Sequence, residues 1–273
     1  MCTIGVKFLK NIGWVGFKNR DRNYYACVTI KKDIDKIYIW DTITKYSEGL
    51  SAAGIGILLA SLVMSEDEDE ITTARRNAAN GEVYYSPAGQ KIREALSHRT
   101  IDEVVQCLID SQTTGHILVF NKDICFSLES SFKLSLGGKV ESNKYESVTT
   151  EIKQEDSQIV RTNHGVLLPY AGYLNNTEQR RSSNSRKIRV EEKLKFADSL
   201  EGIIDAFSDT ESQESQLNPL RLSPVGEEKC TTGQIMIIPS SKQLLYRPVL
   251  GGFIDNPQIN QTPGLTFTQL SAF

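Results

Sequence analysis

The first 40 residues alternate between apolar and polar positions in short runs, a pattern typical of β-strands. The pattern predicts four strands, over residues 3–9, 14–18, 24–31 and 36–40. The first two are joined by a turn at 10–13. A turn centred between Asn11 and Ile12 would place Cys2 roughly opposite Asp21 across the hairpin. The pattern therefore predicts a carboxylate close to the N-terminal end of the first strand.

The middle of the chain changes to helical periodicity and then returns to strands. Helices are predicted over Ala88–Ser97 and Ile101–Ile109, and Thr100 with Glu103 forms a capping box for the second. Further strands are predicted at 117–120, 124–128, 145–150, 158–162, 235–239 and 244–248. The apolar run from Leu50 to Met64 is too short for a membrane helix and predicts a buried strand or a buried turn of the core.

The remaining segments are polar. Residues 65–70 predict an acidic, solvated loop, 209–218 a linker, and 174–187 a basic loop that enters a helix running to about Phe196. The tail at 255–273 shows no usable periodicity. Strands, then helices, then strands predict an α+β fold in which sheets are covered by helices, here as one domain over residues 1–273.

Composition narrows the function classes. The net charge of −3 is spread along the chain and gives no reason to expect a nucleic-acid partner. The five cysteines form no metal-spaced pair and the three histidines are isolated from one another, which predicts no metal site and no cofactor. No signal peptide or membrane helix is visible, so we expect a cytoplasmic protein without a membrane partner.

Cys2 is the strongest chemical candidate. Removal of Met1 would leave a residue that carries both a thiol and a free α-amine. An α-amine has a pKa of about 7.7–8.0, so part of it is neutral at pH 7 and can act as a base. A thiol with its own base is a compact nucleophile for carbonyl carbon. The alternative is that Cys2 is merely a neighbour of the start codon.

Four segments resemble the choloylglycine hydrolase and penicillin acyltransferase-like families of N-terminal-nucleophile hydrolases. They are Met1-Cys2-Thr3, Lys18-Asn19-Arg20-Asp21, Arg161-Thr162-Asn163-His164-Gly165 and Ser185-Arg186-Lys187-Ile188-Arg189. The likeness extends from residue 1 to about 248. Each motif alone is weak, and their order along the chain together with Cys2 carries the resemblance.

The resemblance implies a four-layer αββα sandwich with Cys2 at the end of an inner strand. Cys2 would be the nucleophile, Asp21 would orient its amine, and Asn163 would polarise the carbonyl oxygen. Arg186 would be a distal cation that orients Asp21 or the substrate. The alternatives are a turn or strand-end carboxylate for Asp21, a strand-terminating turn asparagine for Asn163 and an exposed helix-start arginine for Arg186.

Two departures from the family pattern bear on activity. Lys18 stands where the family has an arginine, so the charge is kept and the planar bidentate fork is lost. The stretch Ala53-Gly54-Ile55-Gly56 lacks the oxyanion asparagine of bile salt hydrolases.

Only residues 165–185 separate the last two motifs, where bile salt hydrolases carry a long insertion that helps to assemble tetramers. This argues against bile salts as substrates.

These observations lead us to expect an N-terminal cysteine amidohydrolase that cleaves a linear, non-protein amide through a thioester. An acyltransferase, or a peptidase acting on a small biosynthetic peptide, is a variant of the same chemistry. A non-catalytic binding or scaffold protein is the alternative that Lys18 and the missing asparagine favour. The expected partner is a small-molecule amide or short peptide, and the fold is compatible with homo-oligomers. Because Cys2 follows Met1 directly, no self-cleaved propeptide is expected.

Overall fold

The computed structural model describes residues 2–62, 77, 79–83, 85–134, 140–172, 177–224, 229–250, 252–254 and 268–270. Within these residues the strands form two sheets. The six-stranded sheet has the order β10 (Gln158–Arg161), β1 (Cys2–Leu9), β2 (Gly13–Arg22), β11 (Cys230–Ile238), β12 (Gln243–Pro248) and β14 (Thr268–Leu270). All of its pairings are antiparallel.

The eight-stranded sheet contains most of the first half of the chain. Its order is β13 (Gly252–Ile254), β3 (Ala26–Lys32), β4 (Lys36–Asp41), β5 (Ser47–Ser51), β6 (Gly56–Ala60), β7 (Gly115–Phe120), β8 (Cys125–Leu134) and β9 (Val140–Ile152). Only the β13–β3 pairing is parallel among the described strands. The predicted mixture of helices and strands is confirmed.

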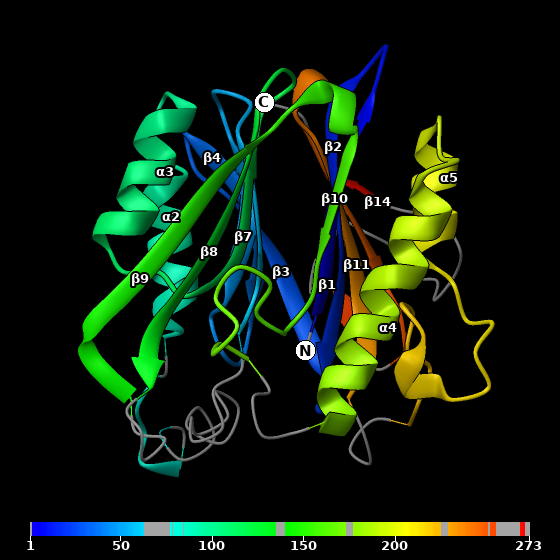
Figure 1. Ribbon diagram of the computed structural model, residues 1–273. Helices are drawn as coiled ribbons and strands as arrows, with labels where there is room; N and C mark the ends of the chain where they lie inside the picture. The colour runs from blue at the N-terminus through cyan, green and yellow to red at the C-terminus, as the bar shows by residue number, and fades with distance from the viewer. Residues whose placement is uncertain are drawn as a thin grey trace.

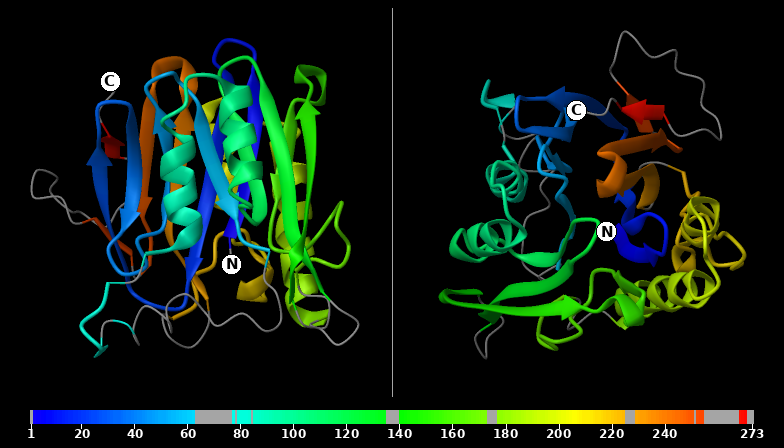
Figure 2. Two further views of the ribbon diagram at one scale, coloured as in Figure 1. Left: turned by 90° about the vertical axis from the view of Figure 1, so that its left-hand side faces the viewer. Right: turned by 90° about the horizontal axis from the view of Figure 1, so that it is seen from above.

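Helices lie on the outer faces of both sheets. α2 (Pro87–Ala95) and α3 (Ile101–Asp110) cover the eight-stranded sheet, whereas α4 (Thr177–Leu194) and α5 (Leu200–Phe207) cover the six-stranded sheet (Figure 1). The view from above shows the same arrangement, with the two sheets facing each other between the helices (Figure 2). Short 3₁₀ turns occur at η1 (Gln154–Asp156), η2 (Ser215–Leu217) and η3 (Pro239–Ser241).

Three apolar clusters hold these elements together. The central cluster joins the inner faces of the two sheets and includes Trp14 and Phe120. A second cluster packs α2 and α3 on the eight-stranded sheet. The third packs α4 and α5 on the six-stranded sheet, where Phe17 contacts Phe207 with ring centroids 4.6 Å apart. The central strands of each sheet are therefore buried on both faces.

Several predicted elements are confirmed, including the capping box of α3, in which Thr100 and Glu103 make both reciprocal hydrogen bonds. The described part of the 50–64 run, residues 50–62, ends β5, turns at Gly54 with a φ of 78° and forms β6, and both strands are buried as predicted. One predicted element is wrong, and one helix was missed. α4 already includes residues from Thr177, so 177–187 are helical rather than a loop. α5 has no predicted counterpart.

The hairpin register differs from the predicted one by one residue. Leu9 pairs with Gly13 and Cys2 pairs with Arg20, so Asp21 is not opposite Cys2. The connection is a three-residue loop, and Gly13 follows it with φ of 90°, a conformation that glycine adopts without strain. A shift of one residue moves every side chain to the other face of a strand. Asp21 therefore lies on the face opposite to Cys2.

The acidic run at 65–70 lies outside the described residues, as does the tail at 255–273 apart from β14. No helix in the described part of the chain combines the length and the apolar character needed to cross a membrane. The assignment of 1–273 to one domain stays a prediction.

Candidate active site

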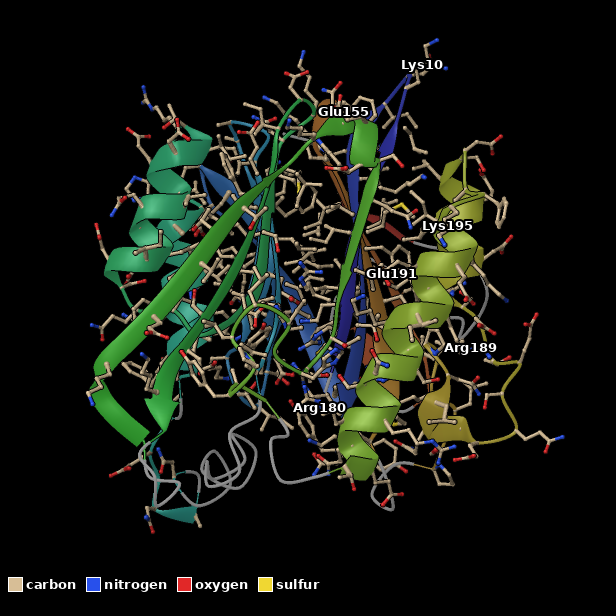
Figure 3. The ribbon with its side chains drawn as sticks, viewed as in Figure 1. Lys10, Glu155, Arg180, Arg189, Glu191 and Lys195 are labelled. Atoms are coloured by element: carbon tan, nitrogen blue, oxygen red, sulfur yellow. The ribbon has the colours of Figure 1, made fainter. Side chains whose placement is uncertain are left out.

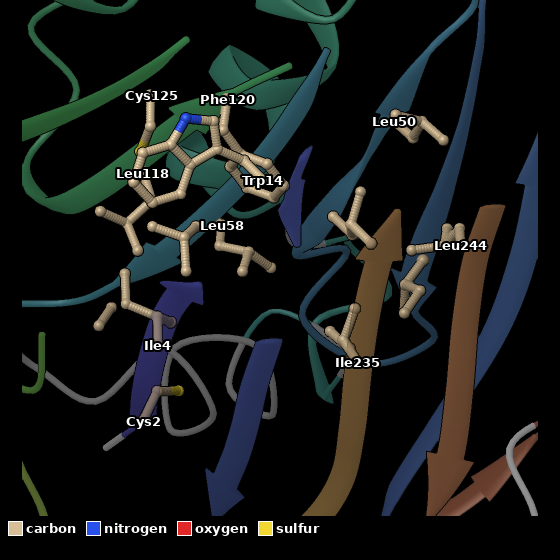
Figure 4. Close-up of a cluster of buried hydrophobic side chains, with 14 of the residues drawn as sticks. Cys2, Ile4, Trp14, Leu50, Leu58, Leu118, Phe120, Cys125, Ile235 and Leu244 are labelled. Atoms are coloured by element: carbon tan, nitrogen blue, oxygen red, sulfur yellow. The ribbon is translucent and has the colours of Figure 1, made fainter. Parts of the chain in front are cut away.

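Cys2 is the first residue of β1, and its side chain lies in the layer between the sheets. It belongs to the central apolar cluster, as does Ile4 two residues further on. Figure 4 shows Cys2 and Ile4 on the same strand, at the margin of that cluster. Alternation along the strand sends Thr3 to the opposite face, towards α4. Cys2 thus stands where the apolar packing of the strand gives way to polar neighbours.

The backbone nitrogen of Cys2 is held by Asn163. The N–H of Cys2 donates to Asn163 Oδ1 at 2.8 Å. Asn163 lies two residues beyond the end of β10 and is itself fixed at two other points. Its Nδ2 donates to the Ser61 carbonyl at 2.7 Å, and its backbone N–H donates to Ser183 Oγ of α4 at 2.9 Å. The amide is therefore positioned by the chain before any substrate binds.

Arg186 connects the residues of this site from the α4 side. Its Nη1 donates to Thr3 Oγ1 at 2.8 Å and to the Cys2 carbonyl at 3.3 Å, and lies 3.4 Å from Asp21 Oδ2. Its Nη2 lies 3.4 Å from Asn163 Oδ1. The guanidinium is fully buried, in the middle of the helix rather than at its start. Arg186 is thus a bridge between the carboxylate and the amide.

Asp21 receives its partners on the face turned away from Cys2. Oδ1 accepts a hydrogen bond from Thr231 Oγ1 at 2.9 Å, and Oδ2 also lies 3.8 Å from Arg221 Nε. Asp21, Arg186 and Arg221 are all fully buried. Two arginines compensate the carboxylate in a site without access to water. Asp21 is connected to the Cys2 carbonyl through Arg186 and does not pair with Cys2 across the hairpin.

Three basic residues of β2, namely Lys18, Arg20 and Arg22, lie on the face of the sheet that Cys2 shares. Lys18 is buried, forms an ion pair with Glu48 of β5 and donates to the Leu59 carbonyl at 2.6 Å. Arg20 pairs with Asp41 at 3.2 Å. Arg22 Nη1 lies 3.5 Å from Cys2 Sγ.

This environment makes Cys2 acidic. Burial raises the pKa of its thiol, but the positive charges of Lys18 and Arg22 outweigh burial and lower the pKa to about 6. Burial raises the pKa of Cys125, Cys107 and Cys230 instead. At neutral pH the thiolate form therefore dominates at Cys2, while these three cysteines stay protonated.

The loop that follows Asn163 is clamped by a buried carboxylate. Glu129 of β8 accepts hydrogen bonds from the backbone N–H groups of Val166, Leu167 and Leu168 at 2.8–3.0 Å. His116 bonds the His164 carbonyl through Nε2 at 2.8 Å. These contacts connect the eight-stranded sheet to the residues beyond Asn163 and restrict how far the asparagine can move.

A cavity of about 550 Å³ lies beside this loop. Its lining includes His164, Arg180, Arg181 and Lys187. Figure 3 shows Arg180 at the N-terminal end of α4. Burial and the nearby charges of Arg180, Lys187 and Arg186 lower the pKa of His164 to about 4. Cys2 does not line this cavity. Asn163 and Arg186 contact the backbone nitrogen and carbonyl of Cys2, beside its thiol.

The structure thus brings Cys2, Lys18, Asn163 and Arg186 together, and reaches Asp21 through Arg186. Sequence reasoning missed Arg22 and Arg221. Arg22 had a usable signal, because basic residues at 18, 20 and 22 share one face of a strand. Arg221 had none, since it lies far along the chain in a segment without periodicity. In the described residues, no group of His, Cys, Asp and Glu side chains is arranged to hold a metal ion.

No protein-family model matches this chain, and no curated protein matches it. Solved structures do. A crystal structure of the C2A mutant of conjugated bile acid hydrolase from Clostridium perfringens aligns with a TM-score of 0.51 and 15% identity, covering 100% of this chain and 97% of that chain. This likeness shows that the chain has the fold of that hydrolase.

Two further alignments have TM-scores below 0.5. Penicillin V acylase from Agrobacterium tumefaciens has a TM-score of 0.49 and 14% identity, over 90% of this chain and 83% of that chain. Another variant of the Clostridium perfringens hydrolase has a TM-score of 0.47 and 12% identity, over 100% and 97%. The resemblance that the sequence motifs indicate is confirmed at the level of the fold, by the first alignment.

Proposed function

We propose that this protein is an N-terminal cysteine amidohydrolase with the αββα fold of the choloylglycine hydrolase-like proteins, and that it cleaves a linear amide. One observation supports this above the others. Cys2, Asp21, Asn163 and Arg186 come from four separate segments and meet in one network of contacts of 2.8–3.4 Å around the Cys2 nitrogen and carbonyl. A fold alone does not require charged and amide groups to be buried together at a cysteine.

The first step uses the thiolate of Cys2. Its sulfur attacks the amide carbon, a C–S bond forms, and the carbonyl electron pair moves to oxygen. Asn163 has one Nδ2 hydrogen beyond the one bound to Ser61, and this donor stabilises the oxyanion. The tetrahedral intermediate then collapses and breaks the C–N bond.

The leaving nitrogen takes its proton from the α-amine of Cys2. The backbone nitrogen is already held at 2.8 Å from Asn163 Oδ1, so removal of Met1 converts a fixed amide nitrogen into a fixed amine. A neutral α-amine next takes a proton from water, the hydroxide attacks the thioester, and the carboxylic acid and the thiolate are released. Arg186 holds the Cys2 carbonyl throughout, which keeps the amine and the sulfur in one orientation.

The experiment is single-turnover trapping by intact mass. The processed wild-type protein is mixed with chromogenic anilides carrying short, aromatic and long-chain acyl groups, and is then acid-quenched. We expect a mass increase equal to one acyl group for the preferred anilide, with release of the aniline. The same reaction with Cys2→Ala should show neither. An acyl adduct that persists in Cys2→Ala, or none with any member of the panel, would contradict the proposal.

A non-catalytic binding protein is the competing candidate, and Lys18 favours it. Lys18 replaces the family's arginine, and its ammonium is bound to Glu48 and the Leu59 carbonyl rather than to the sulfur. Under this alternative the acidic thiol of Cys2 would be alkylated but would never acylate. The trapping experiment separates the two candidates, because only the hydrolase gains an acyl group.

A further inference from the structure

Three basic residues alternate along the end of β2 on the face that Cys2 shares. Cys2 pairs with Arg20, so Lys18 and Arg22 flank that position by two residues on either side. Side chains two residues apart on a strand point to the same face. Three cations of one strand therefore lie on the same face as the nucleophile, and they differ in whether they contact its sulfur.

Two of the three cations have a carboxylate partner. Lys18 forms its ion pair with Glu48, and both side chains are buried. Arg20 pairs with Asp41 Oδ2 at 3.2 Å, and the same oxygen accepts a hydrogen bond from Tyr24 at 3.0 Å. Lys18 acts on Cys2 through its electric field, since its hydrogen bonds are directed at Glu48 and the Leu59 carbonyl.

Arg22 differs from both. Nη1 lies 3.5 Å from Cys2 Sγ and donates to the Asp21 carbonyl at 2.9 Å, and its guanidinium lies 5.5 Å from the centre of the Tyr46 ring. Within the described residues, no carboxylate forms an ion pair with Arg22. The Asp21 carbonyl and the Tyr46 ring fix the guanidinium without an ion pair, and the Asp41 carboxylate acts on it only at longer range. Its charge is thus left facing the sulfur.

We propose that Arg22 is a catalytic residue of this chain, which binds the Cys2 thiolate directly, whereas Lys18 acts on the thiolate only through its charge. This inference rests on the proposed function. Arg22 stabilises the sulfur as an anion before attack and again when the thioester is hydrolysed and the thiolate is released. A planar guanidinium suits this role, because it keeps its charge at every pH in use.

The test measures the alkylation rate of Cys2 by iodoacetamide against pH, read by intact mass. The wild-type rate should rise with pH through a midpoint near 6 and then level off, because only the thiolate reacts. Arg22→Gln removes the charge and should move the midpoint upward by about one pH unit. The rate at pH 6 then falls about fivefold, since the thiolate fraction drops from about one half to about one tenth.

Two further variants serve as controls for the comparison of the wild type with Arg22→Gln. Arg22→Lys keeps the charge and loses the fork, so its midpoint should lie between those of the wild type and Arg22→Gln. Arg181→Gln removes an exposed arginine that pairs with Glu214 at 2.9 Å, and should leave the midpoint unchanged. Circular dichroism is used to check whether each variant is folded. If Arg22→Gln does not fold, the midpoint of Arg22→Lys decides the question.

An unchanged midpoint in a folded Arg22→Gln, or failing that in Arg22→Lys, would overturn the inference. This readout does not require amide turnover. A wild type that cleaves no amide while Arg22→Gln still shifts the midpoint refutes the proposed function and leaves the sulfur contact standing. Turnover by the wild type together with an unshifted midpoint refutes the role of Arg22 alone.

Discussion

The two halves of β2 follow each other in one strand and have opposite compositions. Residues 14–17 are apolar and fully buried, and pack into the clusters on both faces of the sheet. Residues 18–22 are Lys, Asn, Arg, Asp and Arg, of which the first four are also fully buried. The same strand therefore builds core along one half and collects charge along the other.

This difference has an energetic meaning. Burying Trp14 and Phe17 stabilises the fold, by about 1.5–3 kcal/mol for a side chain of that size. Burying Lys18, Arg20 and Asp21 costs desolvation energy that ion pairs seldom exceed. Folding alone gives no reason to place those charges there, so the charged half of β2 is the part that we attribute to chemistry. The predictions below test this division.

The largest expected effect is a difference in amide turnover between alanine variants of two cysteines of the central cluster. Cys2→Ala should lower amide turnover by at least about 10³-fold, because the nucleophile is lost. Cys125→Ala removes a thiol from the same cluster, where burial raises the pKa and keeps it inert. It should cost about 1 kcal/mol of stability and leave turnover unchanged. Chromogenic anilide hydrolysis and urea denaturation measure the two quantities. A Cys125→Ala protein as inactive as Cys2→Ala would break the comparison.

The next effect contrasts Arg186 with Trp14. Arg186→Gln leaves the buried Asp21 carboxylate with Arg221 as its remaining arginine partner, and should cost about 3 kcal/mol of stability. It should also lower turnover by about 10²-fold, because the Cys2 carbonyl and Asn163 lose their common anchor.

Trp14→Ala is the matched change in the apolar half. It should destabilise the protein by about 3–5 kcal/mol and leave the turnover of the folded fraction near the wild-type value. Turnover is measured well below the unfolding temperature of each variant. Equal losses of turnover in Arg186→Gln and Trp14→Ala would show that the site depends on packing rather than on its charges.

A smaller effect concerns Lys18 and Glu48. Lys18→Met should raise the pKa of Cys2 by about one unit and leave Glu48 buried without its partner. The double variant Lys18→Met/Glu48→Leu removes both charges, and should recover part of the lost thermal stability while keeping the raised pKa. Because the wild-type pKa is lowered, the expected loss of alkylation appears between about pH 5 and 8 and vanishes at higher pH. A thiol midpoint still near 6 in both variants would contradict a role for Lys18.

The smallest effect lies away from the site. Thr100→Ala removes the N-cap of α3, whose side chain accepts a hydrogen bond from the Glu103 N–H at 3.3 Å. It should lower stability by about 1 kcal/mol and change neither turnover nor the midpoint of Cys2 alkylation. Thermal unfolding followed by circular dichroism checks the first part. A shifted midpoint would mean that the ionic cluster is coupled to the whole fold.

Local signals in the sequence predicted most of the strands and the capping box, and the resemblance to the family indicated Lys18, Asn163 and Arg186, which the structure brings near Cys2. These signals failed where geometry depends on distant parts of the chain. The register was wrong by one residue because Gly13 adopts a positive φ after a three-residue loop, which alternation alone does not reveal. The start of α4 was missed because its sequence is polar and basic, and its stability comes from packing on the sheet. Arg221 reaches Asp21 only in the folded chain.

The most direct test of the central claim is the intact mass of the purified protein before and after iodoacetamide treatment at pH 7, with Cys2→Ala alongside. We predict that the wild type lacks Met1 and takes up one adduct rapidly, since the pKa of Cys2 is about 6. That adduct should be absent in Cys2→Ala. Retention of Met1, or labelling that is unchanged by Cys2→Ala, would contradict an N-terminal nucleophile at Cys2.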